Sequence, residues 1–311
     1  MSKVDLTKIK TYSIKDRPSK VSVDDFAKTY QRGSTFKGFV DTLPDFIAVK
    51  SLKALVKDIV TARQRGRPVI LGMGAHPIKV GLSPIIIDLI EGGIITAFAT
   101  NGAGIVHDFE IAYQGATSED VAREIDTGTF GMARETGELI NTAIIDGVRD
   151  GFGLGESIGR FIHTQRLKYG HLSIFGTCYQ RSVVSTVHVA IGTDIIHMHP
   201  SADGRSIGEG SLRDFKRLVE VISNLDGGVY INLGSAVIMP EVFLKAITVA
   251  RNLGFDIKEI TTANMDFIQH YRPTVNVLQR PTQLGGRHYA LTGHHEIMFP
   301  LLYAMLKESL C

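Results

Sequence analysis

The stretch IITAFATNGAG at residues 94–104 decides the fold of this chain, because a short apolar run is closed by a turn of small residues. Two further stretches have the same layout, PVILGMG at 68–74 and GVYINLG at 228–234. Helical patterns follow each of them, and parallel strands are joined by such crossover helices. We therefore expect an α/β protein with a Rossmann-like, doubly wound, mostly parallel sheet and helices on both faces.

Amphipathic helices alternate with these strands. The apolar positions between Leu52 and Val60 recur at i, i+3, i+4 and i+7, which predicts a helix that ends near Gly66. Pro240 and Gly254 bracket another helix, from Pro240 to Leu253. The other predicted elements are a helix from Ile105, a helix over SLRDFKRLVEVISNL (211–225), strands over DIKEITT (256–262) and RHYALT (287–292), and a glycine-rich loop over GFGLGESIG (151–159).

The composition is that of one packed globule. Of 311 residues, 44% are apolar and 21% charged, with neither an internal repeat nor a convincing linker. Residues 1–45 are polar and mixed in sign, so we expect an N-terminal arm packed on the main body. Residues 46–311 are then expected to form a single Rossmann-like, nucleotide-binding domain.

Charge and cysteine content restrict the partners and the compartment. Lys and Arg number 34 against 32 Asp and Glu, so the net charge of +2 gives no reason to expect nucleic acid. Cys178 and Cys311 could form at most one bridge, which favours a reducing compartment. The sequence shows neither a signal peptide nor an apolar run of membrane-spanning length. We expect a cytoplasmic protein with a small-molecule substrate and no membrane partner.

Three turns could hold a phosphate: GMGAHPIK (72–79), TNGAGIVHD (100–108) and LGSAVIMP (233–240). In an open parallel sheet such turns meet at the carboxyl edge of the strands, where a crevice forms at the switch in strand order. Free N–H groups at helix starts favour anions. The standard dinucleotide and P-loop patterns do not occur in the expected place, and a glycine after a strand is more often only a tight connection.

The order of the motifs resembles that of the deoxyhypusine synthase family, from about residue 50 to the C-terminus. The segments that carry the resemblance are LIEGGIITAFATNGAGIVHDFE (89–110), HPSADGRSIGE (199–209), INLGSAV (231–237), ARNLGFDIKEITTA (250–263) and MFPLLYAML (298–306). Members of this family use NAD to oxidise spermidine and transfer its aminobutyl group to a lysine of a translation factor. The resemblance implies an NAD-binding fold and a homo-oligomer, in the family usually a tetramer.

Carried over residue by residue, the resemblance implies where NAD is held. His107 replaces a glutamate that holds a ribose, and His294 and His295 replace an Asp-Ala pair. Without that carboxylate, an altered NAD pose and a different nucleotide are both compatible with the sequence. The implied cofactor residues are Gly74, Ala75, His76, Thr100, Asn101, Gly102, Ala103, Gly104, Asp203, Gly204, Ser206, Gly234, Ser235, Thr262, Ala263, Asn264 and His295.

The chemistry departs further from the family. Aligning RPTVNVLQRP (272–281) on the family's motif puts Pro281 at the imine-forming lysine and Gln279 at a tryptophan. Proline cannot form an imine, and the chain contains no Trp. The resemblance therefore implies a relative that keeps the scaffold but not the deoxyhypusine reaction, acting on a small polyamine-related or anionic substrate. A non-catalytic nucleotide-binding or assembly protein is the alternative.

Histidines offer candidates for acid–base and metal chemistry. His107 and His294 are the catalytic candidates, because imidazole titrates near neutrality. If DIIHMH (194–199) is a strand, His197 and His199 project to the same side, and His107 with Asp108 could complete the site of a metal-dependent hydrolase. Two such histidines more often only hydrogen-bond in a polar crevice.

Overall fold

The computed structural model describes residues 4–310, and the chain divides into two compact units, residues 1–50 and 51–311. In the first unit, single turns and one short helix are each capped by an Asp, Ser or Thr side chain. These elements are η1 (Leu6–Lys8), η2 (Ile14–Asp16), η3 (Val23–Asp25) and α1 (Phe36–Val40). That this segment forms an arm packed on the main body stays a prediction.

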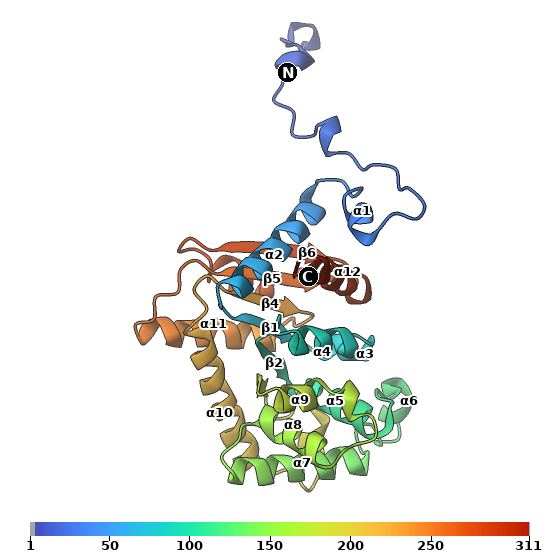
Figure 1. Ribbon diagram of the computed structural model, residues 1–311, viewed down its shortest axis with the longest axis vertical. Helices are drawn as coiled ribbons and strands as arrows, with labels where there is room; N and C mark the ends of the chain where they lie inside the picture. Colours follow the sequence, from blue (N-terminus) through green and yellow to red (C-terminus); the bar gives the residue numbers. More distant parts are fainter. Residues whose placement is uncertain (1–3, 311) are drawn as a thin grey trace. The chain divides into compact units, whose positions relative to one another are not determined.

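The second unit is built on a six-stranded sheet in which every neighbouring pair is parallel (Figure 1). The strand order is β3-β2-β1-β4-β5-β6, so the connections run in opposite directions on either side of the β1/β4 pair. This confirms the predicted parallel, Rossmann-like sheet. The strands are β1 (Val69–Met73), β2 (Ala97–Asn101), β3 (Val184–His188), β4 (Val229–Leu233), β5 (Thr261–Asp266) and β6 (Arg287–Thr292).

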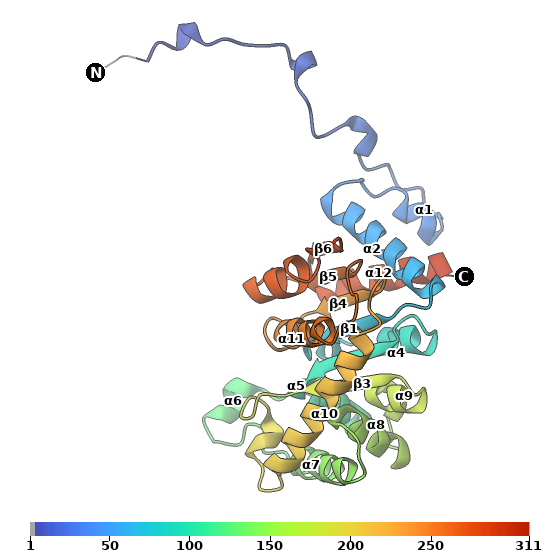
Figure 2. The ribbon, with the colours of Figure 1, turned by 90° about the vertical axis from the view of Figure 1, so that its left-hand side faces the viewer.

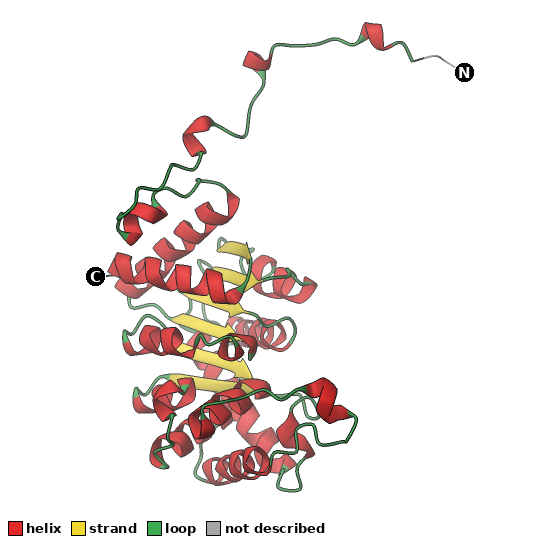
Figure 3. Cartoon of the chain, turned by 90° about the vertical axis from the view of Figure 1, so that its right-hand side faces the viewer, coloured by secondary structure: helices red, strands yellow, loops and turns green. Residues whose placement is uncertain are grey.

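Helices cover both faces of the sheet (Figure 3). On one face, α10 (Gly204–Ile222) and α11 (Ile238–Asn252) lie against each other (Figure 2). Phe243 of α11 stacks on Tyr230 of β4 with ring centroids 3.8 Å apart. On the other, Phe175 of α9 meets Phe98 of β2 at 5.4 Å. The helices are α2 (Ile47–Gln64), α3 (His76–Lys79), α4 (Ser83–Glu91), α5 (Gly102–Gln114), α6 (Val121–Ile125), α7 (Arg134–Arg149), α8 (Leu154–Thr164), η4 (Gly170–Leu172), α9 (Ile174–Gln180), η5 (Ile195–Met198), α10 (Gly204–Ile222), α11 (Ile238–Asn252), η6 (Pro273–Gln279) and α12 (His295–Leu310). Among residues 4–310, no helix is both long and apolar enough to cross a membrane.

The predicted loop at 151–159 is wrong, because α8 begins at Leu154. The glycines of α8 do not end the helix; they allow it to pack closely against neighbouring elements. A Cβ at Gly155 would lie 2.3 Å from the Ser185 carbonyl oxygen, and one at Gly159 would lie 2.5 Å from that of Phe175. Close packing against β3 and α9 thus outweighs the low helix propensity of glycine.

The start of α10 also differs from the prediction. The helix begins at Gly204 rather than near Ser211, because the Asp203 carboxylate accepts a hydrogen bond from the Ser206 N–H at 2.9 Å. Asp214 lies inside this helix. Its buried carboxylate accepts from the N–H groups of Gly155 and Val187, at 2.9 and 2.8 Å.

Three strand expectations need correction. DIKEITT is not a strand over its whole length, since β5 begins only at Thr261. DIIHMH forms the 3-10 turn η5 instead of a strand. The strand β3 was not predicted, because its sequence VSTVH is half polar and carries a weak apolar signal.

Candidate functional site

The switch point between β1 and β4 is closed by two glycines. The Gly74 N–H extends the strand pairing to the Leu233 carbonyl at 3.1 Å. A Cβ at Gly74 would lie 2.4 Å from the Gly234 carbonyl oxygen, so only glycine allows this approach. Gly234 has a φ of +64°, a left-handed conformation that favours glycine. Gly74 is thus buried against the Gly234 backbone, and the His295 ring covers the other side of Gly234, where a Cβ would lie 2.6 Å from its Cε1.

Two histidines meet at this switch point. Nδ1 of His76, the first residue of α3, lies 2.9 Å from Nδ1 of His295, and Nε2 of His295 lies 3.2 Å from the Met265 carbonyl oxygen. A carbonyl can only accept, so neutral His295 carries its hydrogen on Nε2 and accepts the Nδ1–H of His76. Burial lowers the pKa of His295 and keeps it neutral. Nε2 of His76 is then left for another partner.

Aromatic and acidic side chains complete this edge, and the sequence prediction missed them. Phe267 is about half exposed, and its ring centroid lies 6.0 Å from that of His76 and 5.9 Å from that of His295. His294, one of the predicted catalytic residues, stacks on Phe267 at an interplanar angle of 17° and is exposed. Asp266 lies 3.7 Å from Nε2 of His295. Their only sequence signal is that Asp266 and Phe267 follow the predicted Thr-Ala end of a strand.

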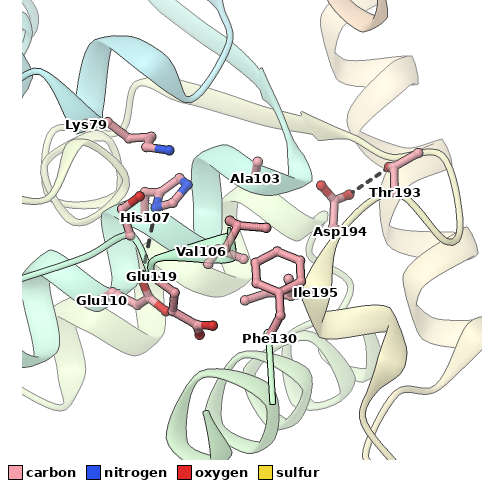
Figure 4. A pocket seen from close by; sticks show the side chains of 12 residues that line it. Lys79, Ala103, Val106, His107, Glu110, Glu119, Phe130, Thr193, Asp194 and Ile195 are labelled. Atoms are coloured by element: carbon pink, nitrogen blue, oxygen red, sulfur yellow. Dashed lines mark hydrogen bonds and ion pairs between the residues drawn. The ribbon is translucent and has the colours of Figure 1, made fainter. Parts of the chain in front are cut away.

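A cavity of about 190 Å³ lies between the ends of α3 and α5 and the segment before η5 (Figure 4). The short helix α3 connects this cavity with the switch point, because its first residue is His76 and its last residue is Lys79. Its floor is apolar and its rim is charged. We call it the His107 pocket; its lining residues are Lys79, Ala103, Val106, His107, Glu110, Ser118, Glu119, Val121, Phe130, Thr193, Asp194 and Ile195.

His107 is held by a chain of hydrogen bonds. Its Nδ1 lies 2.7 Å from Oγ1 of Thr117, which in turn donates to Oε2 of Glu110 at 2.5 Å. Thr136 donates to the other oxygen of that carboxylate at 2.9 Å. Burial lowers the pKa of His107, with a smaller contribution from Lys79, while Glu110 acts in the opposite direction. The imidazole is therefore neutral at neutral pH.

The N-terminus of α5 already carries a carboxylate of this chain. Asn101 caps the helix by accepting from the Gly104 N–H at 3.2 Å. Beside it, the buried Asp194 lies so close that a Cβ at Gly102 would be 2.1 Å from its Oδ2. Burial raises the pKa of Asp194, and a hydrogen bond from the Ala103 N–H opposes that shift. A second anion does not fit here, so the NGAG turn gives no support to the predicted phosphate contact.

Other predicted cofactor residues have roles inside the protein. Thr262, Ala263 and Asn264 are fully buried in β5. Asn264 accepts from Nδ2 of Asn232 at 2.7 Å. Ser235 accepts from the Met239 N–H at the start of α11, and Asp203 and Ser206 bond to each other at the start of α10, where Gly204 has open space around it.

The predicted metal ligands are not brought together. The buried carboxylate of Asp108 accepts from the Ser173 hydroxyl at 2.5 Å and from the Ile174 N–H at 2.8 Å, at the start of α9. Nε2 of His199 bonds to the Gly131 carbonyl at 2.8 Å, and Nδ1 of His197 accepts from the Gly192 N–H at 3.2 Å. Within residues 4–310, no three His, Cys, Asp or Glu side chains are grouped to hold a metal ion.

Comparison with known proteins gives structural neighbours only. No family model matches the chain, and no curated protein matches its sequence. A protein from Entamoeba histolytica that is provisionally assigned as a deoxyhypusine synthase is similar with a TM-score of 0.54 and 13% identity, over 89% of this chain and 96% of its own. A provisionally assigned LOR/SDH protein from Methanococcus maripaludis S2 is similar with a TM-score of 0.52 and 17% identity, over 84% of this chain and 70% of its own.

AgrE, solved in a ternary complex with ornithine and NAD⁺, is similar with a TM-score of 0.53 and 15% identity, over 84% of this chain and 34% of its own. The chain thus spans about a third of the length of AgrE, and the same holds for the cyanobacterial arginine dihydrolase ArgZ, at 31%. At these identities the neighbours establish the fold alone. The second unit has a Rossmann-like α/β fold, which it shares with these neighbours.

Proposed function

We propose that this protein binds a nicotinamide dinucleotide across the ends of β1 and β4 and acts as an NAD-dependent enzyme on a small molecule in the His107 pocket. One observation carries the proposal: the strand order reverses at β1/β4, where the glycine turns that follow the two strands meet next to paired imidazoles. In open α/β sheets, ligands bind at such a reversal. The NAD⁺ bound to AgrE supports the choice of cofactor.

The residues at the switch point fit this cofactor better than those of the NGAG turn. Gly74 and Gly234 let the two turns meet at the sheet edge, with the His295 ring packed on Gly234. Nε2 of His76 can donate to a phosphate oxygen once that ring is protonated, because its Nδ1–H is directed at His295. Phe267 gives an exposed aromatic surface on which a base can stack. When bound, the cofactor would supply a hydride acceptor.

The pocket charges favour a substrate with a cationic group. Glu110, Glu119 and Asp194 line the cavity together with a single lysine, Lys79 (Figure 4). This agrees with a polyamine-related substrate better than with an anionic one. The segment at the family's catalytic lysine has a structural role here, since the Pro281 carbonyl accepts from Arg251 at 2.8 Å. We therefore propose no imine intermediate. By resemblance, the enzyme is expected to work as a homo-oligomer.

Calorimetric titration with NAD⁺ and NADH tests this proposal. His76→Ala should weaken dinucleotide binding about tenfold, equivalent to ~1.4 kcal/mol for one lost charge-assisted hydrogen bond. His163→Ala, which removes an exposed histidine from α8, should leave the affinity unchanged. If the unmodified protein binds neither form of the dinucleotide, the proposed function is refuted. Turnover of an amine substrate would exclude the non-catalytic alternative.

A further inference from the structure

We infer that the His107 pocket is a proton-transfer site, in which Thr117 and Glu110 position His107 so that its Nε2 takes a proton from an ammonium or hydroxyl group of a small substrate. The N–H or O–H bond of the substrate breaks, its electron pair stays on the nitrogen or oxygen, and the proton bonds to Nε2. The proton transfer itself does not depend on the proposed function; only the reaction that the substrate undergoes afterwards rests on it.

The hydrogen-bond chain fixes which ring nitrogen is free. The Thr117 hydroxyl has one hydrogen, and it donates this hydrogen to Glu110 at 2.5 Å. At the 2.7 Å contact with His107, Oγ1 of Thr117 can then only accept. Neutral His107 must therefore carry its hydrogen on Nδ1. Nε2 is left with a lone pair, which is the arrangement that a general base requires.

The chain also stabilises the product of proton transfer. Glu110 is buried, and its carboxylate lies 4.0 Å from Nδ1 of His107, close enough to favour an imidazolium. The hydroxyls of Thr117 and Thr136 hold both of its oxygens in place. The carboxylate thus orients the hydroxyl of Thr117, and the hydroxyl orients the imidazole.

Charged groups from several elements set the proton affinity of the ring. Lys79 at the end of α3 opposes protonation of His107, whereas Glu110 on α5 favours it. Glu119, from the loop before α6, and Asp194, from the segment before η5, also line the cavity. Burial acts with Lys79 and lowers the pKa of His107. The ring is therefore unprotonated and ready to accept a proton at neutral pH.

Nitrogen-15 NMR of the histidine rings in the full chain, between pH 5 and pH 8, tests this inference without knowledge of the substrate. The spectra should show His107 as the Nδ1–H tautomer, titrating below the ordinary histidine pKa of about 6.5. Lys79→Met should shift this titration to higher pH and Glu110→Gln to lower pH. A midpoint that moves in neither variant would show that these charges do not set the proton affinity of His107, and would overturn the inference.

Substitutions of Thr117 test separately whether its hydroxyl sets the tautomer of His107. Thr117→Val should make the Nε2–H form the major tautomer of His107, whereas Thr117→Ser, which keeps the hydroxyl, should restore the original one. Thr248→Val removes an exposed hydroxyl from α11 and should change nothing. An Nε2–H tautomer in the unmodified protein, or an unchanged tautomer in Thr117→Val, would overturn the inference. Dinucleotide titration of the same samples shows independently whether the proposed function fails.

Discussion

The most specific prediction concerns Gly102→Ala at the start of α5. An added Cβ would lie 2.1 Å from Oδ2 of Asp194 and 2.5 Å from its Cγ, so the buried carboxylate must leave the helix N-terminus. Overpacking of this kind costs about 1–3 kcal/mol, and the lost interaction with the helix dipole costs up to ~2 kcal/mol. Helix propensity offsets up to ~1 kcal/mol of this cost. We expect a net destabilisation of about 2–3 kcal/mol.

The matched control is Gly204→Ala. Gly204 is also the first residue of a helix and also follows an Asx cap, but a Cβ there would have nothing within 4 Å. This variant should be neutral or stabilised by up to ~1 kcal/mol. Chemical denaturation of both variants gives the comparison.

A double-mutant cycle identifies the cause. In an Asp194→Ala background, Gly102→Ala should behave like the Gly204→Ala control, because the colliding carboxylate is gone. The coupling free energy between positions 102 and 194 should then be at least about 2 kcal/mol. If Gly102→Ala is as harmless as the control, or if the coupling is near zero, Asp194 does not occupy the N-terminus of α5 and the NGAG turn is again open to a phosphate.

Three further predictions follow from other parts of the molecule. Burial raises the pKa of Asp214 to about 7, so its contribution to stability is full below pH 3.8 and is lost as pH rises through 7. A rise of this size corresponds to about 4 kcal/mol, and Asp214→Asn should flatten the pH dependence of urea unfolding between pH 4 and pH 8. Gly155→Ala should destabilise by about 1–3 kcal/mol in thermal unfolding, because its Cβ would meet the Ser185 carbonyl at 2.3 Å; an unaffected variant would mean that α8 does not pack on β3 as described. Dinucleotide affinity should fall about tenfold in His76→Ala, because Nε2 of His76 is the ring nitrogen left for a partner at the switch point, and an unchanged affinity would exclude this role.

The sheet was predictable because apolar runs mark its strands and glycines mark the turns that follow them. The runs at β1, β2 and β4 each bury every residue or nearly every one, and a fully buried parallel strand is apolar throughout. β3 could not be found in this way, because Ser185, Thr186 and His188 interrupt the apolar run, and Thr186 and His188 bond to each other at 3.0 Å. Asp214, which binds the Val187 N–H of β3, lies 27 positions further along the chain.

The candidate site was predictable in its location but not in its contacts. The sequence located the turns at Gly74 and Gly234 because the glycines themselves mark them. The pairing of His76 with His295 spans 219 positions, and no local pattern indicates it. Asp194 belonged to an expected strand, so its place at the start of α5 depends on tertiary packing alone.

A crystal structure of the protein with NADH bound tests the central claim most directly. The account predicts a dinucleotide across the ends of β1 and β4, with its pyrophosphate beside Gly74, Gly234 and the His76 ring. A pyrophosphate bound at the start of α5, with Asp194 displaced, would contradict it. So would a protein that remains unliganded at saturating NADH.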